Sequence, residues 1–424
     1  MHSTRSRADV TMSGCEEATQ RRIVLMPADY LPNIGGHEIV VRRLADSLTS
    51  NGWSVRIVTP MKSPRLRIRE IMDDVEVLRL PMQLPVGLRR PMAASVGRLV
   101  GKCVLLPACF VWNWAVLSHL ARLFRPQIVH AHYVGPNALY AALLARLSGA
   151  KLVLSIHGDD VLREARLPLW GRWLFRTAIR SSDALLSNSN DLLVAARKLD
   201  IEEPETVTVV WNDVDTATFR SAVGRPREYL LGIGRFVHRK GFDVLVRAFS
   251  RLPESCSHAP LVLAGDGPEL RRCRALAEDL DIAERVQFLG EVPYEDVPGL
   301  MAGARLVAVP SRDEPFGLVV IEAMAAESPV VAATVGGIPE IVQNEENGLL
   351  VPRDDPDALA WAMGRILSDH DLARSLAARG LATVKERFSR EAVMERYLAV
   401  YEGLLRDPPR GGAVRSTAST MEGS

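Results

Sequence analysis

Two glutamates around an expected helix start carry the most chemical information in this sequence. Glu314 lies in a loop after an apolar, strand-like run, and Glu322 lies further on in an Ala-rich helical stretch. At the start of that helix the backbone N–H groups of Phe316, Gly317 and Leu318, with the helix dipole behind them, would form an anion site. A carboxylate beside a phosphate makes sense if it accepts hydrogen bonds from sugar hydroxyls of the same ligand. The stretch therefore predicts a nucleotide-sugar pocket.

Two cations follow the first expected strand of the second half of the chain. Arg235, after Gly234, offers a planar fork to phosphate oxygens, and Lys240 offers a point charge nearby. The plain alternative is that both are solvated surface residues. Their position just past the carboxyl end of a strand, where α/β proteins bind ligands, favours a role in phosphate binding.

Two glycine turns fit either a structural or a binding role. Gly35 and Gly36 follow the first expected strand, and adjacent glycines let a phosphate or sugar approach the backbone closely. A tight turn alone explains them equally well. Gly265 to Pro268 ends a later strand and opens a helix, with proline in the first turn. We leave both readings open.

Three histidines raise the possibility of a metal site. His130 and His132 lie in one expected strand, and His157 ends another, next to Asp159. We expect His130 and His132 to point to opposite faces of their strand, so that at most one faces a given site, which makes a metal site the minority interpretation. His157 lies at the lip of the expected cleft, where a neutral imidazole could donate to a sugar hydroxyl or to a reacting oxygen.

The elements that must position these residues alternate regularly. Apolar strand-like runs alternate with helical stretches from residue 22 onwards, and after a polar segment near 220–228 the alternation starts again. This predicts two facing, Rossmann-like, doubly wound α/β domains with a cleft between them. We place the first domain at 22–222, the second at 223–388, and a last helix at 389–406 that packs back on the first domain. Residues 1–21 and 407–424 are expected to be a disordered lead-in and tail.

The composition sets limits on the class of protein. The chain has 424 residues, 47% hydrophobic and 24% charged, with a net charge of +1, which fits a soluble globular protein without an overall signal for a polyanionic partner. Its 5 cysteines include no C-x-x-C pair, which fits a reducing compartment. The polar opening lacks the apolar core of a secretory signal. We expect a cytoplasmic protein.

The segment from Lys62 to Arg125 is basic and interleaved with apolar residues. Such a surface could hold the first domain against anionic lipid on the cytoplasmic face of a membrane, and a solvated basic face is the equal alternative. Residues 103–121 lack formal charge and approach the length of a membrane span, but Pro107, Asn113 and His119 favour a buried or interfacial helix. Aromatic residues are scarce in the basic part, so no nucleic-acid partner is expected.

Taken together, these motifs resemble the retaining, metal-independent glycosyltransferases of family 4, which have the GT-B fold of two facing Rossmann-like domains. The resemblance runs from about residue 22 to residue 405. It rests on Gly35-Gly36-His37-Glu38, His157-Gly158-Asp159-Asp160, Gly234-Arg235, Lys240-Gly241, Gly265-Asp266-Gly267-Pro268, Glu314-Pro315-Phe316-Gly317, Glu322-Ala323-Met324-Ala325, Val335-Gly336-Gly337-Ile338-Pro339-Glu340 and Asn347-Gly348.

The resemblance implies a role for each donor-side residue. Arg235 and Lys240 would hold the donor diphosphate, helped by the backbone N–H groups of Gly36 and of Gly317 and Leu318. Glu314 and the backbone of Phe316 and Gly317 would hold hydroxyls of the donor sugar. Glu322 would hold the ribose, and the base would lie near Val292. The catalytic set implied is His157, Glu314, Arg235 and Lys240.

On the acceptor side the resemblance is weaker. It implies that Gly35, His37, His132 and Asp159 line the acceptor site of the first domain. The activity implied is transfer of a hexosyl unit, with retention, from a UDP-sugar or GDP-mannose to a sugar or lipid-linked acceptor in glycolipid or polysaccharide biosynthesis. No metal or other cofactor is expected.

The chain departs from the family pattern at one position. Asp213 stands where such enzymes usually have glycine. Glycine there suits a turn with positive φ, and aspartate tolerates that conformation better than most residues, so the geometry of the turn between the domains could be altered. Two rival functions remain. One is a metal-dependent hydrolase that uses His130, His132, His157 and Asp159, and the other is a non-catalytic subunit that binds nucleotide sugars.

Overall fold

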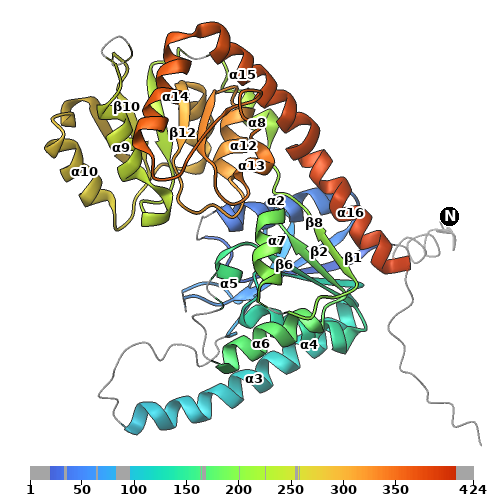
Figure 1. Ribbon diagram of the computed structural model, residues 1–424. Coiled ribbons are helices and arrows are strands. Elements are labelled where there is room, and N and C mark those ends of the chain that lie inside the picture. The colour runs from blue at the N-terminus through green and yellow to red at the C-terminus, as the bar shows by residue number, and fades with distance from the viewer. Residues whose placement is uncertain are drawn as a thin grey trace, which may run out of the picture.

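The computed structural model describes residues 20–32, 36–63, 65–82, 96–162, 164, 169–199, 201–224, 226–253, 256 and 258–406. Side chains are not described for 37, 96–106 and 170. The expected lead-in up to residue 19, the expected tail 407–424 and Gly35 lie outside the described residues. Two α/β domains lie one above the other in Figure 1, and each is built around its own sheet.

The first domain is built on a sheet of eight described strands in the order β3-β4-β2-β1-β5-β6-β7-β8. All of its neighbouring strands run parallel except β3 and β4. The strands are β1 Arg22–Pro27, β2 Ser54–Pro60, β3 Arg69–Met72, β4 Val75–Leu80, β5 Ile128–His132, β6 Lys151–Ile156, β7 Ala184–Ser187 and β8 Thr206–Val209. The helices are α2 Gly36–Ser50, α3 Val96–Phe124, α4 Pro136–Ser148, α5 Asp159–Leu162, α6 Leu169–Arg180 and α7 Asn190–Arg197. The next helix, α8 Thr216–Arg220, packs on the second domain, where Phe219 shares a buried cluster with Leu231.

The second domain has a parallel sheet of six described strands in the order β11-β10-β9-β12-β13-β14. The strands are β9 Tyr229–Ile233, β10 Leu261–Ala264, β11 Val286–Gly290, β12 Ala304–Val309, β13 Val330–Ala333 and β14 Leu349–Val351. The helical elements are η2 His238–Lys240, α9 Phe242–Ser250, α10 Leu270–Asp279, η4 Ala283–Arg285, η5 Tyr294–Asp296, α11 Val297–Ala302, α12 Leu318–Ala325, α13 Ile338–Ile341, α14 Pro356–Ser368, α15 His370–Thr383, η6 Val384–Phe388 and α16 Arg390–Arg406.

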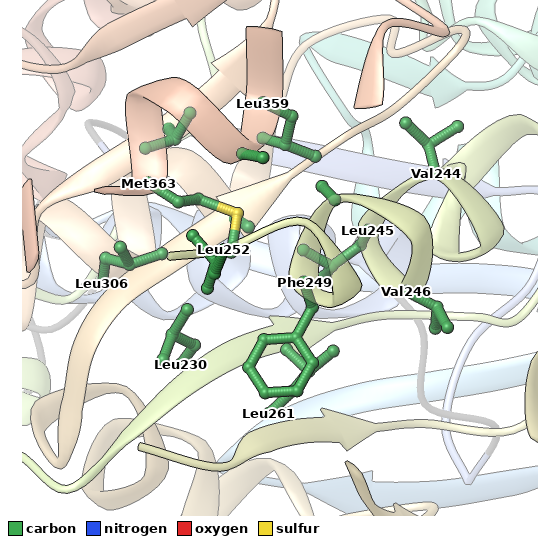
Figure 2. Close-up of a cluster of buried hydrophobic side chains, with 14 of the residues drawn as sticks. Leu230, Val244, Leu245, Val246, Phe249, Leu252, Leu261, Leu306, Leu359 and Met363 are labelled. Carbon is green, nitrogen blue, oxygen red and sulfur yellow. The ribbon is translucent and has the colours of Figure 1, made fainter. Parts of the chain in front are cut away.

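Both sheets are buried on their two faces, which explains why their strands are continuous apolar runs in the sequence. In β1, Ile23 packs into the cluster on one face and Val24 into the cluster on the other. Figure 2 shows one such cluster in the second domain, where Phe249 of α9 lies over Leu230 and Leu261 of the sheet, with Met363 of α14 beside them. These layers support the predicted fold class of two Rossmann-like domains.

The last helix, α16, crosses from the second domain to the first (Figure 1). Its buried residues Met394, Tyr397 and Tyr401 share a cluster with Ile23 of β1 and with residues of α2. The helix therefore covers one face of the first sheet and ties the end of the chain to its beginning.

Helix α3 is the longest described helix of the first domain and carries Pro107 inside it. Its residues Leu117, Leu120 and Phe124 are buried against the domain, whereas Trp112 and Trp114 are exposed. None of the helices in the described ranges has the length and apolar character needed to cross a membrane.

Candidate active site

A cleft of about 1110 Å³ lies between the two domains, at the carboxyl ends of the parallel strands. Its lining combines residues that lie far apart in the sequence, from Ala28 to Glu322. Of the predicted site residues, those that line the cleft are Gly36, His157, Asp159, Arg235, Lys240, Val292, Glu314, Phe316, Gly317, Leu318 and Glu322. His132 is fully buried behind it, Gly35 is not described, and neither is the side chain of His37.

Lys240 and Glu314 form an ion pair inside the cleft. Lys240 Nζ lies 2.5 Å from Glu314 Oε2, and Ser311 Oγ donates to the same oxygen at 3.2 Å. The Glu314 carboxylate is almost fully buried, so the ammonium compensates a charge that would be costly to leave unpaired. Lys240, predicted to bind phosphate, and Glu314, predicted to bind the donor sugar, therefore lie side by side.

The loop that carries Glu314 is anchored by Arg312. Its guanidinium makes a bidentate pair with Asp243 of α9, at 2.9 and 2.8 Å, and donates to the His238 carbonyl at 2.8 Å. Burial acts to raise the pKa of the Asp243 carboxyl, but the hydrogen bonds and charge of Arg312 outweigh it and hold that pKa below its usual range. This arginine has a structural role, because it fixes the loop to η2 and so sets Glu314 opposite Lys240.

Helix α12 begins at the cleft directly after this loop. Its N-cap is Gly317, which has a φ of +115° and provides no side-chain cap, so the first N–H groups of the helix are left for solvent or a ligand. Across the cleft, α2 begins at Gly36, where an added Cβ would come within 2.8 Å of Leu318 Cδ1. Two helix starts thus meet at one place, which suits a negatively charged ligand.

Glu322 lies one helix turn deeper in the same wall. Tyr294 Oη donates to Glu322 Oε1 at 2.8 Å, and Arg43 Nη2 of the first domain lies 3.8 Å from the same oxygen. Burial raises the pKa of Glu322, while Arg43 and the hydrogen bond from Tyr294 act to lower it. Sequence reasoning missed Arg43 and Tyr294, because neither belongs to a motif and only the fold brings them to Glu322.

The two cationic residues predicted to bind phosphate differ in environment. Lys240 is paired, whereas Arg235 is exposed at the cleft and makes no side-chain hydrogen bond or ion pair with the described residues. Between them in the sequence, Arg239 turns to the other wall, where its Nη1 donates to Asp159 Oδ1 of the first domain at 2.8 Å. Arg239 was also missed, although its position between two predicted cations was a usable signal.

His157 lies between two other rings at the end of β6. Its ring stacks on those of Tyr133 and His132, with centroids 5.2 and 5.3 Å apart, and its Nε2 lies 3.2 Å from His132 Nδ1. Burial lowers the pKa of His157 to about 4. The imidazole is therefore neutral near pH 7, as the prediction of a neutral hydrogen-bonding residue requires.

The expectation that His130 and His132 point to opposite faces of β5 was wrong. Their ring centroids are 4.0 Å apart, because residues separated by two positions in a strand lie on the same face. Both ring nitrogens of His130 are engaged, with Tyr401 Oη and with Ser155 Oγ, each at 2.7 Å. Burial lowers the pKa of His130 to about 3.

These contacts do not favour the rival metal-dependent hydrolase. His130 has no ring nitrogen left for a ligand, and the carboxylate of Asp159 is paired with Arg239. Within the described ranges, no group of three or more His, Cys, Asp or Glu side chains is arranged to hold a metal ion.

The backbone at Asp213 takes an ordinary conformation. Asp213 does not have a positive φ, so the position usually occupied by glycine needs no left-handed conformation here. Its side chain is buried, and burial raises the pKa of this carboxyl against the opposing effects of Arg43 and Arg390. Asp213 thus introduces a buried carboxylate into the segment that joins the domains.

Direct contacts hold the two domains close together. Ser189 Oγ donates to the Pro315 carbonyl at 2.7 Å, and Glu340 accepts from the Asn190 side chain at 2.8 Å. At Gly158, which has a φ of +128°, an added Cβ would lie 2.3 Å from Pro315 Cγ. The closed cleft therefore depends on a glycine at this point of contact.

Comparisons with known proteins agree with this architecture. Residues 213–382 match the family described as "Glycosyl transferases group 1", and residues 34–218 match "Glycosyltransferase Family 4". In structure the chain is similar to sucrose-phosphate synthase from Thermosynechococcus elongatus, with a TM-score of 0.73 and 25% identity over 91% of this chain and 100% of that one. The fold is thus that of the GT-B glycosyltransferases.

Two curated relatives cover nearly the whole chain. It is 31% identical to the N-acetyl-alpha-D-glucosaminyl L-malate synthase of Bacillus anthracis, over 90% of this chain and 97% of that protein. It is 35% identical to a D-inositol 3-phosphate glycosyltransferase of Acidothermus cellulolyticus, over 95% of this chain and 93% of that protein. The chain belongs to the family 4 glycosyltransferases, as its motifs predicted, and is a glycosyltransferase.

Proposed function

We propose that this protein transfers a hexosyl unit, with retention at the anomeric carbon, from a nucleoside-diphosphate sugar to an acceptor hydroxyl. The observation that carries the proposal is the Lys240–Glu314 pair beside the start of α12, with buried Glu322 in the same wall. A cation and a helix start suit a diphosphate, and carboxylates suit hydroxyl groups. This wall belongs to the second domain, which we assign to the donor.

Catalysis in this proposal comes from charge that develops on the leaving diphosphate. Arg235, Lys240 and the helix start bind that charge more strongly as the bond to the sugar breaks. Glu314 orients the sugar, because its carboxylate is already engaged by Lys240 and is poorly placed to act as a base. Neutral His157 donates or accepts a hydrogen bond beside the reacting carbon.

Retention follows from attack on the same face that the diphosphate leaves, with the leaving oxygen taking the proton of the incoming hydroxyl. The test is NMR of the product: a donor with an axial diphosphate should give an axial glycosidic linkage. An inverted product would contradict the proposal. Activity after treatment with excess EDTA tests the proposed independence from metal ions, and a strict requirement for added Mg²⁺ or Mn²⁺ would contradict it.

The donor is best identified by binding. A thermal-shift series with UDP, GDP, ADP and their sugars should raise Tm for one base above the others, since a ligand of the folded state stabilises it. A relative named for N-acetylglucosaminyl transfer makes UDP-N-acetylglucosamine the first compound to test, with GDP-mannose beside it. Slow hydrolysis of the donor by the isolated protein would distinguish an enzyme from a binding subunit.

For the acceptor we propose a sugar or lipid-linked hydroxyl in glycolipid or polysaccharide biosynthesis, bound by the first domain. In that domain, α3 and α6 expose the aromatic residues Phe110, Trp112, Trp114 and Trp173, and α6 adds Arg176 and Arg180 on the same side as Trp173. Exposed tryptophan beside arginine suits the interface of an anionic bilayer. We therefore propose a cytoplasmic enzyme, peripheral on the membrane.

Vesicle sedimentation tests this surface. Wild type should pellet with vesicles that contain about a third phosphatidylglycerol and less with pure phosphatidylcholine, as expected of attraction to anionic lipid. Trp112→Ser combined with Trp173→Ser should abolish pelleting, and Trp361→Ser, at an exposed site of the second domain, should not. Equal pelleting of all three proteins would contradict the proposal.

A further inference from the structure

An arginine of the first domain contacts Glu322, which we assign to the donor ribose, and its neighbour Tyr294 in the second domain. Arg43 lies in α2 and is only 6% exposed. Its Nη2 donates to Tyr294 Oη, which in turn donates to Glu322 Oε1 at 2.8 Å. Its Nη1 donates to the Asp213 carbonyl at 2.6 Å. One guanidinium thus joins α2, the segment between the domains, and the donor wall.

These contacts determine which oxygen of the Glu322 carboxylate can bind a ligand. Oε1 is engaged by Tyr294 and lies 3.8 Å from Arg43, so Oε2 is the oxygen left to accept from ribose hydroxyls. Accepting from hydroxyls requires the ionised carboxylate, and a buried carboxylate stays ionised only with a compensating charge. Lys240 is already paired with Glu314, which leaves Arg43 as the nearer source of that charge.

Asp213 adds a second reason for the position of Arg43. Its carboxylate is buried, and its Oδ2 has no hydrogen-bond partner among the described residues. The negative charge of Asp213 acts on Glu322 in the unfavourable direction, and Arg43 offsets it at both carboxylates. Arg390, the other arginine near Asp213, pairs with Asp215 at 3.2 Å, so it compensates Asp213 only in part.

We infer that Arg43 is a positioning residue for the donor ribose, and that through Tyr294 and Glu322 it couples recognition of the ribose hydroxyls to closure of the two domains. The inference rests on the proposed function, because it takes Glu322 as the ribose ligand. Arg43 reaches Glu322 only when α2 lies against the donor wall. Binding of a ribose that needs the oriented carboxylate therefore favours the closed arrangement of the domains, and closure favours ribose binding in return.

The experiment compares UDP and GDP with their 2′-deoxy and 3′-deoxy forms by calorimetry. Wild type should bind the better ribonucleotide about tenfold or more tightly than one of its deoxy forms, as expected for a hydrogen bond to a charged group. In Arg43→Met this ratio should fall toward one. The matched control is Arg42→Met, the neighbouring position on α2, where the side chain is half exposed and pairs with Asp73 at 2.8 Å; its ratio should stay as in wild type.

The ratio separates positioning from a merely structural role, because a damaged fold would weaken both ligands equally. Tyr294→Phe removes only the bridging hydroxyl and should lower the ratio even if Arg43→Met proves unstable. If Arg43→Met or Tyr294→Phe binds the ribonucleotide and keeps the wild-type ratio, the inference is wrong. If wild type binds none of these nucleotides, the proposed function itself fails, which is a distinct result.

Discussion

The guanidinium of Arg239 and the carboxylate of Asp159 meet across the cleft at 2.8 Å, and each belongs to a different domain. Both side chains are roughly one-third exposed, so the pair contributes little to stability by itself. Both residues line the cleft, so the pair must break whenever the two domains separate.

Charge reversal tests whether Asp159 joins the domains or binds the acceptor. Asp159→Arg alone should raise KM and lower kcat/KM by about fivefold or more, since like charges would then oppose closure. The double variant Asp159→Arg with Arg239→Asp should recover most of the loss if the pair acts only in closure. Failure of that rescue, seen as a persistently high acceptor KM, would instead support the predicted acceptor role of Asp159.

Removal of either cation that we propose to bind the diphosphate should lower the rate strongly. Arg235→Ala and Lys240→Ala should each lose about 2–4 kcal/mol of transition-state stabilisation in kcat/KM, the range for one lost electrostatic contact. Lys198→Ala, at an exposed position of the first domain, is the control and should turn over as wild type does. Steady-state kinetics with saturating acceptor measures both, and near-wild-type turnover in Arg235→Ala would remove it from the donor site.

Gly158→Ala should hinder closure more than it destabilises the fold. The added methyl group would clash with Pro315 of the other domain, 2.3 Å away, and the domains would have to move apart. Gly149→Ala is a matched control, because Gly149 also has a positive φ but has open space around its Cα. Gly149→Ala should lose about 1 kcal/mol from its left-handed conformation, and Gly158→Ala somewhat more, because a φ of +128° lies outside the left-handed helical region. Only Gly158→Ala should lose activity by about tenfold or more, as misplacement of reacting groups predicts.

The buried histidines predict the acid sensitivity of the fold. Burial lowers the pKa of His157 to about 4 and that of His130 to about 3, below the value of 6.5 of an accessible imidazole. Below pH 6.5 the unfolded chain therefore takes up protons that the folded chain does not, and the free energy of unfolding falls by about 1.4 kcal/mol per pH unit for each histidine. The free energy of unfolding contributed by these two histidines is fully present above pH 6.5 and is lost progressively toward pH 4.

Denaturant unfolding at pH 7.5, 6.5 and 5.5 measures that slope. His157→Gln should reduce the slope by the amount that corresponds to about one proton taken up on unfolding. His258→Gln, at an exposed site, should leave the slope unchanged. A slope in His157→Gln equal to that of wild type would show that His157 is already protonated in the folded state near pH 6. The proposed neutral hydrogen-bonding role of His157 would then be wrong.

The prediction of the fold succeeded because it depended on local patterns. Apolar strand runs buried on both faces, such as β1 and β5, are recognisable without knowledge of their neighbours. The error at His130 and His132 came from the interpretation and not from the pattern, since alternate positions of a strand share a face. At Asp213 the sequence left the backbone conformation open, because aspartate accepts either sign of φ, and the structure has no positive φ there.

By itself, the sequence determined the two α/β domains and the family, and it predicted motif residues that line the cleft, because those depend on residue type and on short spacing. Only the tertiary structure decided which charges meet. It set Lys240 on Glu314, Arg239 on Asp159 and Arg43 beside Glu322. Such pairs join elements far apart in the chain, and the energy that makes them specific, the cost of burying an unpaired charge, arises only once the domains are folded and in contact.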